Sequence, residues 1–241
     1  MSAATRAEIC AVACAEAFRG DGEILASPMG PIPKLGALLA KHTFEPGLAM
    51  TDGVASLVEG RTVTGRMHYR KVFDVVWAGR RHVMMGASQI DQYGNQNISC
   101  VGDHARPKVQ LLGARGAPGN TINHPTSYWV PKHSARVLVP HVDFVSGVGY
   151  DRAAALGPAG RFVEIRCVVT NLAVLDFATS DRRMRLRSVH PGVTVEEVVA
   201  ATGFELVVDA VETSRMPTDD ELRLMREVLD PDGRMRGTVP G

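Results

Sequence analysis

The sequence has almost no excess charge and few aromatic side chains. Its 27 Lys and Arg are balanced by 26 Asp and Glu, and only 5% of its 241 residues are aromatic. Proteins that bind nucleic acids usually carry a marked basic excess, and single-strand binders add aromatic platforms on which bases stack. These two absences argue against a nucleic-acid partner.

Long apolar runs are also missing. The first apolar run, residues 9–15, lies between Glu8 and Glu16 and is seven residues long, so it does not fit the pattern of a signal peptide. A membrane span needs roughly 18 apolar residues, and no stretch of the sequence approaches that length. We therefore expect no membrane partner and a cytoplasmic location.

Cysteine is scarce, and metal-binding motifs are absent. Four cysteines in 241 residues form no Cys-x-x-Cys pair, and the eight histidines form no His-x-x-x-His pair. Such a chain has neither a disulfide framework nor the ligand spacing of a zinc or iron site. Phosphate-binding and nucleophile-elbow motifs are missing too. We predict no bound metal and no bound cofactor.

What the sequence does contain is an alternation of helix and strand signals. Capping boxes at Thr5–Glu8, Thr194–Glu197 and Thr218–Glu221 predict three helix starts. Apolar spacing over residues 69–77 predicts a further helix. With 45% hydrophobic residues the chain can bury a sizeable core. The alternation predicts one α/β domain over residues 1–241, with a loose tail at 231–241.

Strands are predicted where short apolar or β-branched runs are bounded by Gly or Pro. Several of these runs are apolar on both faces, which is typical of sheets covered by helices. The last two of these runs, residues 172–177 and 184–189, are expected to form a more antiparallel section of the sheet. The predicted strands are residues 81–86, 108–112, 136–139, 142–145, 162–169, 172–177 and 184–189.

Two polar segments are candidates for a site. Residues 86–99, GASQIDQYGNQNIS, follow a predicted strand and are dense in amides, and open α/β sheets place ligand-binding loops at such positions. A polar turn centred on Gly94 and Asn95 explains the same pattern equally well. Residues 113–120, GARGAPGN, form a glycine-rich loop. Its N–H groups can converge on an anion, although an ordinary glycine turn is the alternative.

The first of these segments resembles the pattern G-A-x-Q-[VI]-D-x-x-G-N-x-N of class I coenzyme A transferase β subunits. Residues 171–177, 186–197 and 201–204 resemble the strand, His-Pro-Gly turn and helix near the C-terminus of that family. The glycine-rich loop 113–120 occupies the same place in the sequence as the glycine-rich loop of that family. The resemblance extends over roughly residues 5–230 and implies an open, mostly parallel α/β sheet flanked by helices. It also implies a homologous α subunit, often in an α2β2 assembly, and coenzyme A that is bound only as part of an acyl-CoA substrate.

One position departs from the family. Its transferases carry a nucleophilic Glu in an E-x-G motif, whereas the matching stretch here reads Thr51-Asp52-Gly53. A Thr hydroxyl without an adjacent base is a poor nucleophile. Asp52 is one position away and one methylene shorter, and an offset near 1 Å can cost about 100-fold in rate. Ordinary CoA transfer is therefore not expected.

This departure resembles a branch of the family whose members open a steroid ring. The resemblance implies hydrolytic C–C cleavage of a cyclic oxocyclohexene-carboxyl-CoA during cholesterol catabolism, with the general base supplied by the α subunit. Two alternatives stay open. One is a true CoA transferase for a dicarboxylic or keto acid, with Asp52 as nucleophile. The other is a non-catalytic scaffold subunit.

Within that framework the resemblance suggests roles for particular residues. Gln89 and Asn95 are expected to line the acyl pocket, and Asp91 and Asn97 to hold the turn through side-chain-to-backbone bonds. Thr51 and Asp52 are expected to face the cavity left by the transferase Glu, although Asp52 can instead serve only to cap the turn. Hydrogen bonds to the oxyanion or to the thioester oxygen are expected from Gly113, Gly116, Gly119 and Asn120.

Arg106 and Lys108 lie just before the glycine-rich loop in the sequence. They are candidates for contacts with the phosphates of coenzyme A. Charged residues in a polar segment are also often no more than a solvated surface, and that alternative stays open.

Overall fold

The computed structural model describes residues 3–52, 56–59, 62–68, 71, 74 and 79–239. The chain divides into two compact units, Met1–Met85 with Thr213–Gly241, and Gly86–Glu212. The predicted helix at 69–77 falls almost wholly outside the described residues, and the prediction of a single domain stays a prediction. None of the described helices is long and apolar enough to cross a membrane.

The first unit contains a sheet with the strand order β5-β1-β2-β3-β4. β1 pairs in parallel with both β2 and β5, whereas β2–β3 and β3–β4 are antiparallel. The strands are β1 (Leu25–Pro28), β2 (Ala49–Thr51), β3 (Ser56–Glu59), β4 (Thr62–Arg66) and β5 (Arg81–Gly86). The helical segments are α1 (Arg6–Glu16), α2 (Pro31–Thr43), α7 (Asp219–Arg223), the π-helical turn η2 (Leu224–Leu229) and the 3-10 turn η3 (Arg236–Thr238).

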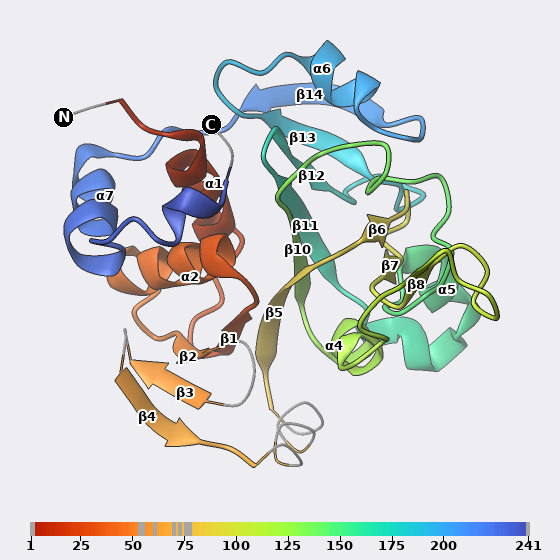
Figure 1. Cartoon of the computed structure of the whole chain (residues 1–241), viewed down its shortest axis with the longest axis horizontal. Coiled ribbons are helices and arrows are strands. Elements are labelled where there is room, and N and C mark those ends of the chain that lie inside the picture. Colours follow the sequence, from red (N-terminus) through yellow and green to blue (C-terminus); the bar gives the residue numbers. More distant parts are fainter. Residues whose placement is uncertain are drawn as a thin grey trace. The chain divides into compact units, whose positions relative to one another are not determined.

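Helices from the two ends of the chain pack together in this unit (Figure 1). α1 and α2 touch closely because Gly36 has no side chain; a Cβ built there would lie 2.6 Å from the Cβ of Cys14. Cys10 and Cys14 are fully buried small residues in α1. The capping boxes predicted for α1 and α7 are confirmed, because both reciprocal bonds are present in each.

The C-terminal segment is held to α1 by a buried carboxylate. Glu8 accepts two hydrogen bonds from Arg226, at 2.7 and 2.8 Å, and one of 3.0 Å from Arg236. Bonds from these arginines and from the backbone of Thr5 outweigh the effect of burial and lower the pKa of Glu8 to about 2. The tail predicted to be loose is therefore tied down over residues 231–239, because Arg236 also bonds to Asp230.

The second unit has a sheet with the strand order β14-β13-β12-β11-β10 and two small ribbons, β6–β7 and β8–β9. β10 and β11 are parallel, whereas β11–β12 and β12–β13 are antiparallel. The sheet strands are β10 (Thr126–Val130), β11 (Ile165–Thr170), β12 (Ala173–Asp176), β13 (Arg185–Val189) and β14 (Val207–Thr213). The ribbon strands are β6 (Gln89–Ile90), β7 (Gln96–Asn97), β8 (Cys100–Val101) and β9 (Val109–Gln110). The helical segments are α4 (Ala117–Asn123), α5 (Tyr150–Ala155), η1 (Gly157–Phe162) and α6 (Val195–Ala200).

Most predicted strands of this unit are present, and the predicted antiparallel section is confirmed by β12 and β13. The strands predicted at 136–139 and 142–145 are wrong. Within residues 136–145 only Leu138 makes a bridge, to Ile90. Pro140 separates the two runs and lacks the N–H that a strand ladder needs. Their backbone serves instead to fasten the amide-rich segment, since Val139 donates to the carbonyl of Ile90 at 3.0 Å.

Candidate functional site

The amide-rich segment 86–99 is a buried hydrogen-bond network. Gln89 donates through Nε2 to Asp143 Oδ2 at 3.0 Å and accepts through Oε1 from Asn97 Nδ2 at 2.7 Å. Asn97 also donates to the carbonyl of Cys100 at 2.6 Å and accepts from the N–H of Ser99 at 2.9 Å. Gln89 and Asn97 therefore tie this segment to β8 and to the loop that carries Asp143.

Asn95 lies at a second node of the same segment. Its amide nitrogen lies 3.0 Å from Asp91 Oδ2 and 2.7 Å from Asp151 Oδ1, and its Oδ1 accepts from the N–H of Gly149 at 2.8 Å. Burial raises the pKa of Asp91, and hydrogen bonds from Asn95 and from backbone N–H groups oppose that rise. The predicted turn-holding roles of Asp91 and Asn97 are confirmed by their bonds. The predicted role of Gln89 and Asn95 in the acyl pocket stays a prediction, and both side chains are buried.

The ribbon β8–β9 leads out of this network. The N–H of Gly102 donates to Asp143 Oδ2 at 2.8 Å, and that bond, followed by the one from Gln89, lowers the pKa of the Asp143 carboxyl. Asp143 thus bridges the amide-rich segment and the start of the ribbon turn. Arg106 and Lys108 are exposed in that turn.

The glycine-rich loop runs from the ribbon into α4. Gly113 has a φ of +85°, a conformation that favours glycine, and Gly116 caps α4 at its start. The N–H of Asn120 donates to the carbonyl of Gly116 at 3.0 Å, so it is used within the helix. The Asn120 side chain is buried and packs against Gly116. Donation by Gly113, Gly116, Gly119 and Asn120 to a substrate oxygen stays a prediction.

In the first unit, Thr51 belongs to a buried polar row across three adjacent strands. Its hydroxyl donates to Ser27 Oγ at 3.1 Å, and Arg81 Nε donates to the same oxygen at 2.7 Å. Thr51 is 1% exposed and Ser27 and Arg81 are also buried. Burial lowers the pKa of Arg81 to about 10, so the guanidinium stays charged at neutral pH. Thr51 and Ser27 lie at or near the carboxyl ends of β2 and β1, where open sheets bind ligands.

Asp52 has a different surrounding. Its N–H donates to the carbonyl of Ser56 at 3.0 Å, and its Oδ1 accepts from the N–H of Ser56 at 3.1 Å. These two bonds to Ser56 agree with the capping interpretation, and whether Asp52 has a further role stays a prediction. Its carboxylate is exposed, whereas the Thr51 hydroxyl is not.

Sequence reasoning missed Ser27, Arg81 and Asp143. Ser27 and Arg81 carry no motif. Ser27 meets Thr51, and Arg81 meets Ser27, only because β1 lies between β5 and β2 in the sheet. Asp143 lies in a stretch that we had predicted to be a strand. Its polarity between two valine-containing runs is the one local signal that could have pointed to it.

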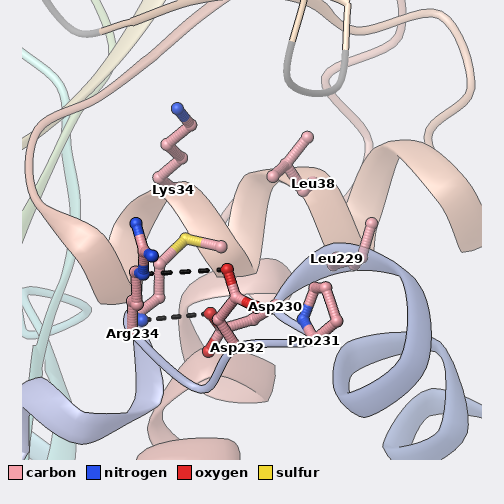
Figure 2. Close-up of a pocket in the computed structure, with 8 residues that line it drawn as sticks. Lys34, Leu38, Leu229, Asp230, Pro231, Asp232 and Arg234 are labelled. Carbon is pink, nitrogen blue, oxygen red and sulfur yellow. Dashed lines mark hydrogen bonds and ion pairs between the residues drawn. The ribbon is translucent and has the colours of Figure 1, made fainter.

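A cavity of about 190 Å³ opens elsewhere in the first unit, where the C-terminal segment crosses α2. The residues that line it include Lys34 and Leu38 of α2 and, from the C-terminal segment, Pro231 and the ion pair of Asp232 with Arg234 (Figure 2). None of the predicted site residues lines this cavity. Within the described ranges, no three His, Cys, Asp or Glu side chains gather in a way that could hold a metal ion.

The sheet topology and the polar loops at strand ends define an α/β protein of the open-sheet class, with ligand chemistry expected at loops. The chain belongs to the coenzyme A transferase family, since the family model for coenzyme A transferase matches residues 21–201. The predicted resemblance is thereby confirmed.

Individual relatives narrow the comparison. The chain is 55% identical over 236 residues to the cholesterol ring-cleaving hydrolase IpdB subunit of Rhodococcus jostii, covering 94% of this chain and 93% of the relative. The crystal structure of Rhodococcus jostii RHA1 IpdAB matches with a TM-score of 0.93 and 51% identity over the full length of both chains. Glutaconate coenzyme A-transferase from Acidaminococcus fermentans matches with a TM-score of 0.84, 27% identity and 98% coverage of each chain. The predicted open, mostly parallel α/β fold flanked by helices is confirmed.

Proposed function

We propose that this chain is the β subunit of a heteromeric hydrolase that opens the last steroid ring in cholesterol catabolism. The observation that carries the proposal is the 55% identity to an IpdB subunit across 94% of the chain. The identity to glutaconate CoA-transferase falls to 27% over a similar length. A Thr whose hydroxyl is bonded to Ser27 at the position expected for the transferase Glu agrees with this difference.

The proposed substrate is a cyclic oxocyclohexene-carboxyl-CoA. One water first adds across the ring C=C bond, which makes the carbon α to the thioester saturated. A second water adds to the ring ketone, and the C–C bond between the ketone carbon and that α carbon then breaks. The bonding electrons pass to the α carbon as a thioester enolate, which takes up a proton, and the former ketone carbon becomes a carboxylate. Such a reaction needs a general base for water and donors for the developing oxyanion.

A homologous α subunit supplies the general base in this proposal, and an α2β2 assembly is its simplest form. The present chain supplies part of the wall of the substrate pocket and hydrogen-bond donors. The oxyanion loop consists of Gly116, Gly119 and Asn120. Coenzyme A enters as part of the substrate, and no separate cofactor or metal takes part. The proposed location is the cytoplasm.

The proposal is tested by co-expressing this chain with its α subunit and supplying the cyclic CoA ester in H₂¹⁸O. We expect one ¹⁸O in the new carboxylate and no borohydride-trapped adduct on Asp52. An adduct on Asp52 together with a carboxylate free of solvent oxygen would instead identify a CoA transferase.

Three substitutions complete this test. Thr51→Val should lower kcat no more than about fivefold, because the lost hydroxyl bonds to Ser27 and an ordinary hydrogen bond contributes about 1 kcal/mol. Thr51→Glu should abolish ring opening, and any CoA-transferase activity it creates would mark Thr51 as the position of the transferase Glu. If Asn120→Ala leaves kcat unchanged in the assembled enzyme, the oxyanion role fails and a scaffold subunit becomes the better description.

A further inference from the structure

The turn that follows β8 concentrates positive charge. Residues 102–116, which we name the basic hairpin, contain Arg106, Lys108 and Arg115 but only one acidic residue, Asp103. These fifteen residues therefore carry a formal charge of +2, whereas the whole chain carries +1. The rest of the chain sums to −1, so the basic hairpin is one of the segments where an approaching anion meets local positive charge.

The three cations of the basic hairpin are exposed and, among the described residues, form no ion pair. Elsewhere in the same unit two half-buried arginines do pair; Arg183 bonds Asp181 at 2.9 Å and Arg166 bonds Glu164 at 2.8 Å. The charge of Lys108 helps to lower the pKa of the Asp143 carboxyl, but the two groups form no ion pair. All three cations therefore remain available to phosphate oxygens.

An aromatic stack and an apolar surface adjoin these cations. The His104 ring stacks on Phe144 with centroids 4.7 Å apart and an angle of 21° between the planes. Val109 is 48% exposed and Leu112 is 80% exposed, the largest exposure among the exposed large apolar residues of the described chain. A purine ring can pack on such a stack, and an apolar chain can cover Val109 and Leu112.

The backbone of the basic hairpin is fixed at its base. Gly102 is bonded to Asp143, and Lys108 donates from its N–H to the carbonyl of Val101 at 2.9 Å. Asp103 Oδ1 accepts from the N–H of Ala105 at 2.7 Å, which sets the turn before Arg106. A turn held in this way presents its charges with little ordering cost upon binding.

The order of residues along the basic hairpin also matches the order of chemical groups along one ligand. Its C-terminal part contains Gly113 and Gly116 and leads directly into α4, where the thioester oxygen is expected. Coenzyme A has its phosphates at one end, a flexible and partly apolar pantetheine arm in the middle, and the thioester at the other. Cations, apolar side chains and glycine-rich loop follow in the same order along residues 106–119.

We propose that the basic hairpin binds the nucleotide end of the CoA substrate. Arg106 and Lys108 contact the 3′-phosphate and the diphosphate, the adenine packs beside His104 and Phe144, and the pantetheine arm passes over Leu112. The inference rests on the proposed function in so far as the substrate is a CoA thioester. It adds the residues and the subsite that hold the end of the molecule remote from the reaction.

The test compares three thioesters of the same cyclic acid in the assembled α/β enzyme: the CoA, dephospho-CoA and pantetheine esters. Arg106→Ala with Lys108→Ala should raise KM for the CoA ester at least tenfold, and the pantetheine ester, which has no nucleotide phosphates, should show the same KM as with the unaltered enzyme. The dephospho-CoA ester should show an intermediate change. Arg106→Lys with Lys108→Arg keeps a positive charge at both positions and should stay within about threefold for the CoA ester, since the Coulomb attraction to the phosphates is retained.

Lys132→Ala with Arg136→Ala is the matched control, because both cations are exposed in the same unit but outside the basic hairpin. It should leave the KM of all three esters unchanged. Equal effects of the Arg106 and Lys108 substitutions on the CoA and pantetheine esters, or no effect on either, would overturn the proposal. Loss of assembly with the α subunit on size-exclusion chromatography would also overturn it and would identify the basic hairpin as a subunit contact.

Failure of the proposed function gives a different result. In that case the unaltered complex opens no cyclic CoA ester, yet titration calorimetry with free coenzyme A and dephospho-CoA still tests the basic hairpin. Tighter binding of coenzyme A that is lost in the double Ala variant supports the subsite by itself, and equal binding of the two nucleotides in both proteins refutes it.

Discussion

The amide-rich segment 86–99 and the basic hairpin 102–116 are neighbours in sequence with opposite surroundings. In the first, Gln89, Asn95 and Asn97 are buried and bonded to other protein groups. In the second, Arg106 and Lys108 are exposed and, in the described chain, outside any ion pair. Segment 86–99, which carries the family motif, is thus a buried and hydrogen-bonded support. The basic hairpin rests on that support, follows no such motif and presents its charges to solvent.

The physical reason lies in what each kind of group loses when it is changed. A buried amide or carboxylate that loses its partner retains the full cost of desolvation, about 1–3 kcal/mol or more. An exposed cation is hydrated whether or not a ligand is present, so its removal costs the fold little. Stability therefore constrains segment 86–99, whereas only function constrains the charges of the basic hairpin.

The largest expected effect comes from breaking the support. Asn95→Leu removes the amide that bonds both Asp91 and Asp151 and leaves the buried carboxylate of Asp91 with fewer donors. We expect the free energy of unfolding to fall by about 3 kcal/mol, measured by urea denaturation. Gln92→Leu, in the same segment but with a less buried side chain, is the control and should change it by less than about 1 kcal/mol. Equal losses in the two variants would show that Asn95 has no special supporting role.

A smaller effect is expected from pH at a buried histidine of the same unit. His133 lies between the hydroxyls of Thr170 and Thr202, each 3.0 Å from a ring nitrogen, and burial lowers its pKa from 6.5 to about 4. The unfolded chain binds the proton more tightly, so stability is full above pH 6.5 and falls as the pH drops toward 4. Between pH 7 and pH 5 the loss amounts to about 2 kcal/mol.

Urea denaturation at a series of pH values measures this slope. His133→Gln should flatten it, because glutamine does not titrate, whereas His42→Gln at an exposed position should leave it unchanged. Glu8 does not interfere, since its pKa is lowered from 4.5 to about 2 and its contribution is lost only below pH 4.5. An unaltered slope in His133→Gln would assign the pH dependence to other groups.

The smallest expected effect is on the basic hairpin itself. Arg106→Ala and Lys108→Ala, singly or together, should change the free energy of unfolding by less than about 0.5 kcal/mol, because neither cation contacts a carboxylate in the described chain. Thermal and urea unfolding check this. A loss above 1 kcal/mol would mean that these charges support the fold, and the contrast with segment 86–99 would disappear.

Local signals predicted parts of the fold well. All three capping boxes formed as expected, since each depends only on residues three positions apart. The strand β10 was missed because Thr126-Ser127 reads as polar although both side chains are fully buried. The helix α2 was missed because Pro31 and Pro33 suggest a loop, yet prolines in the first turn are compatible with a helix.

The sequence by itself determined the α/β class, the helix starts, the family and the departure at Thr51, since each depends on residue type and short spacing. Only the tertiary structure decided what surrounds those residues. Ser27 meets Thr51 from 24 positions away and meets Arg81 from 54 positions away, because parallel strands bring distant segments together. The hydrogen bonds between these side chains follow from that pairing. In the same way Asp143 joins Gln89 to Gly102 across more than 40 positions. A buried polar group must find a partner in space, and its neighbours in sequence do not reveal which one it finds.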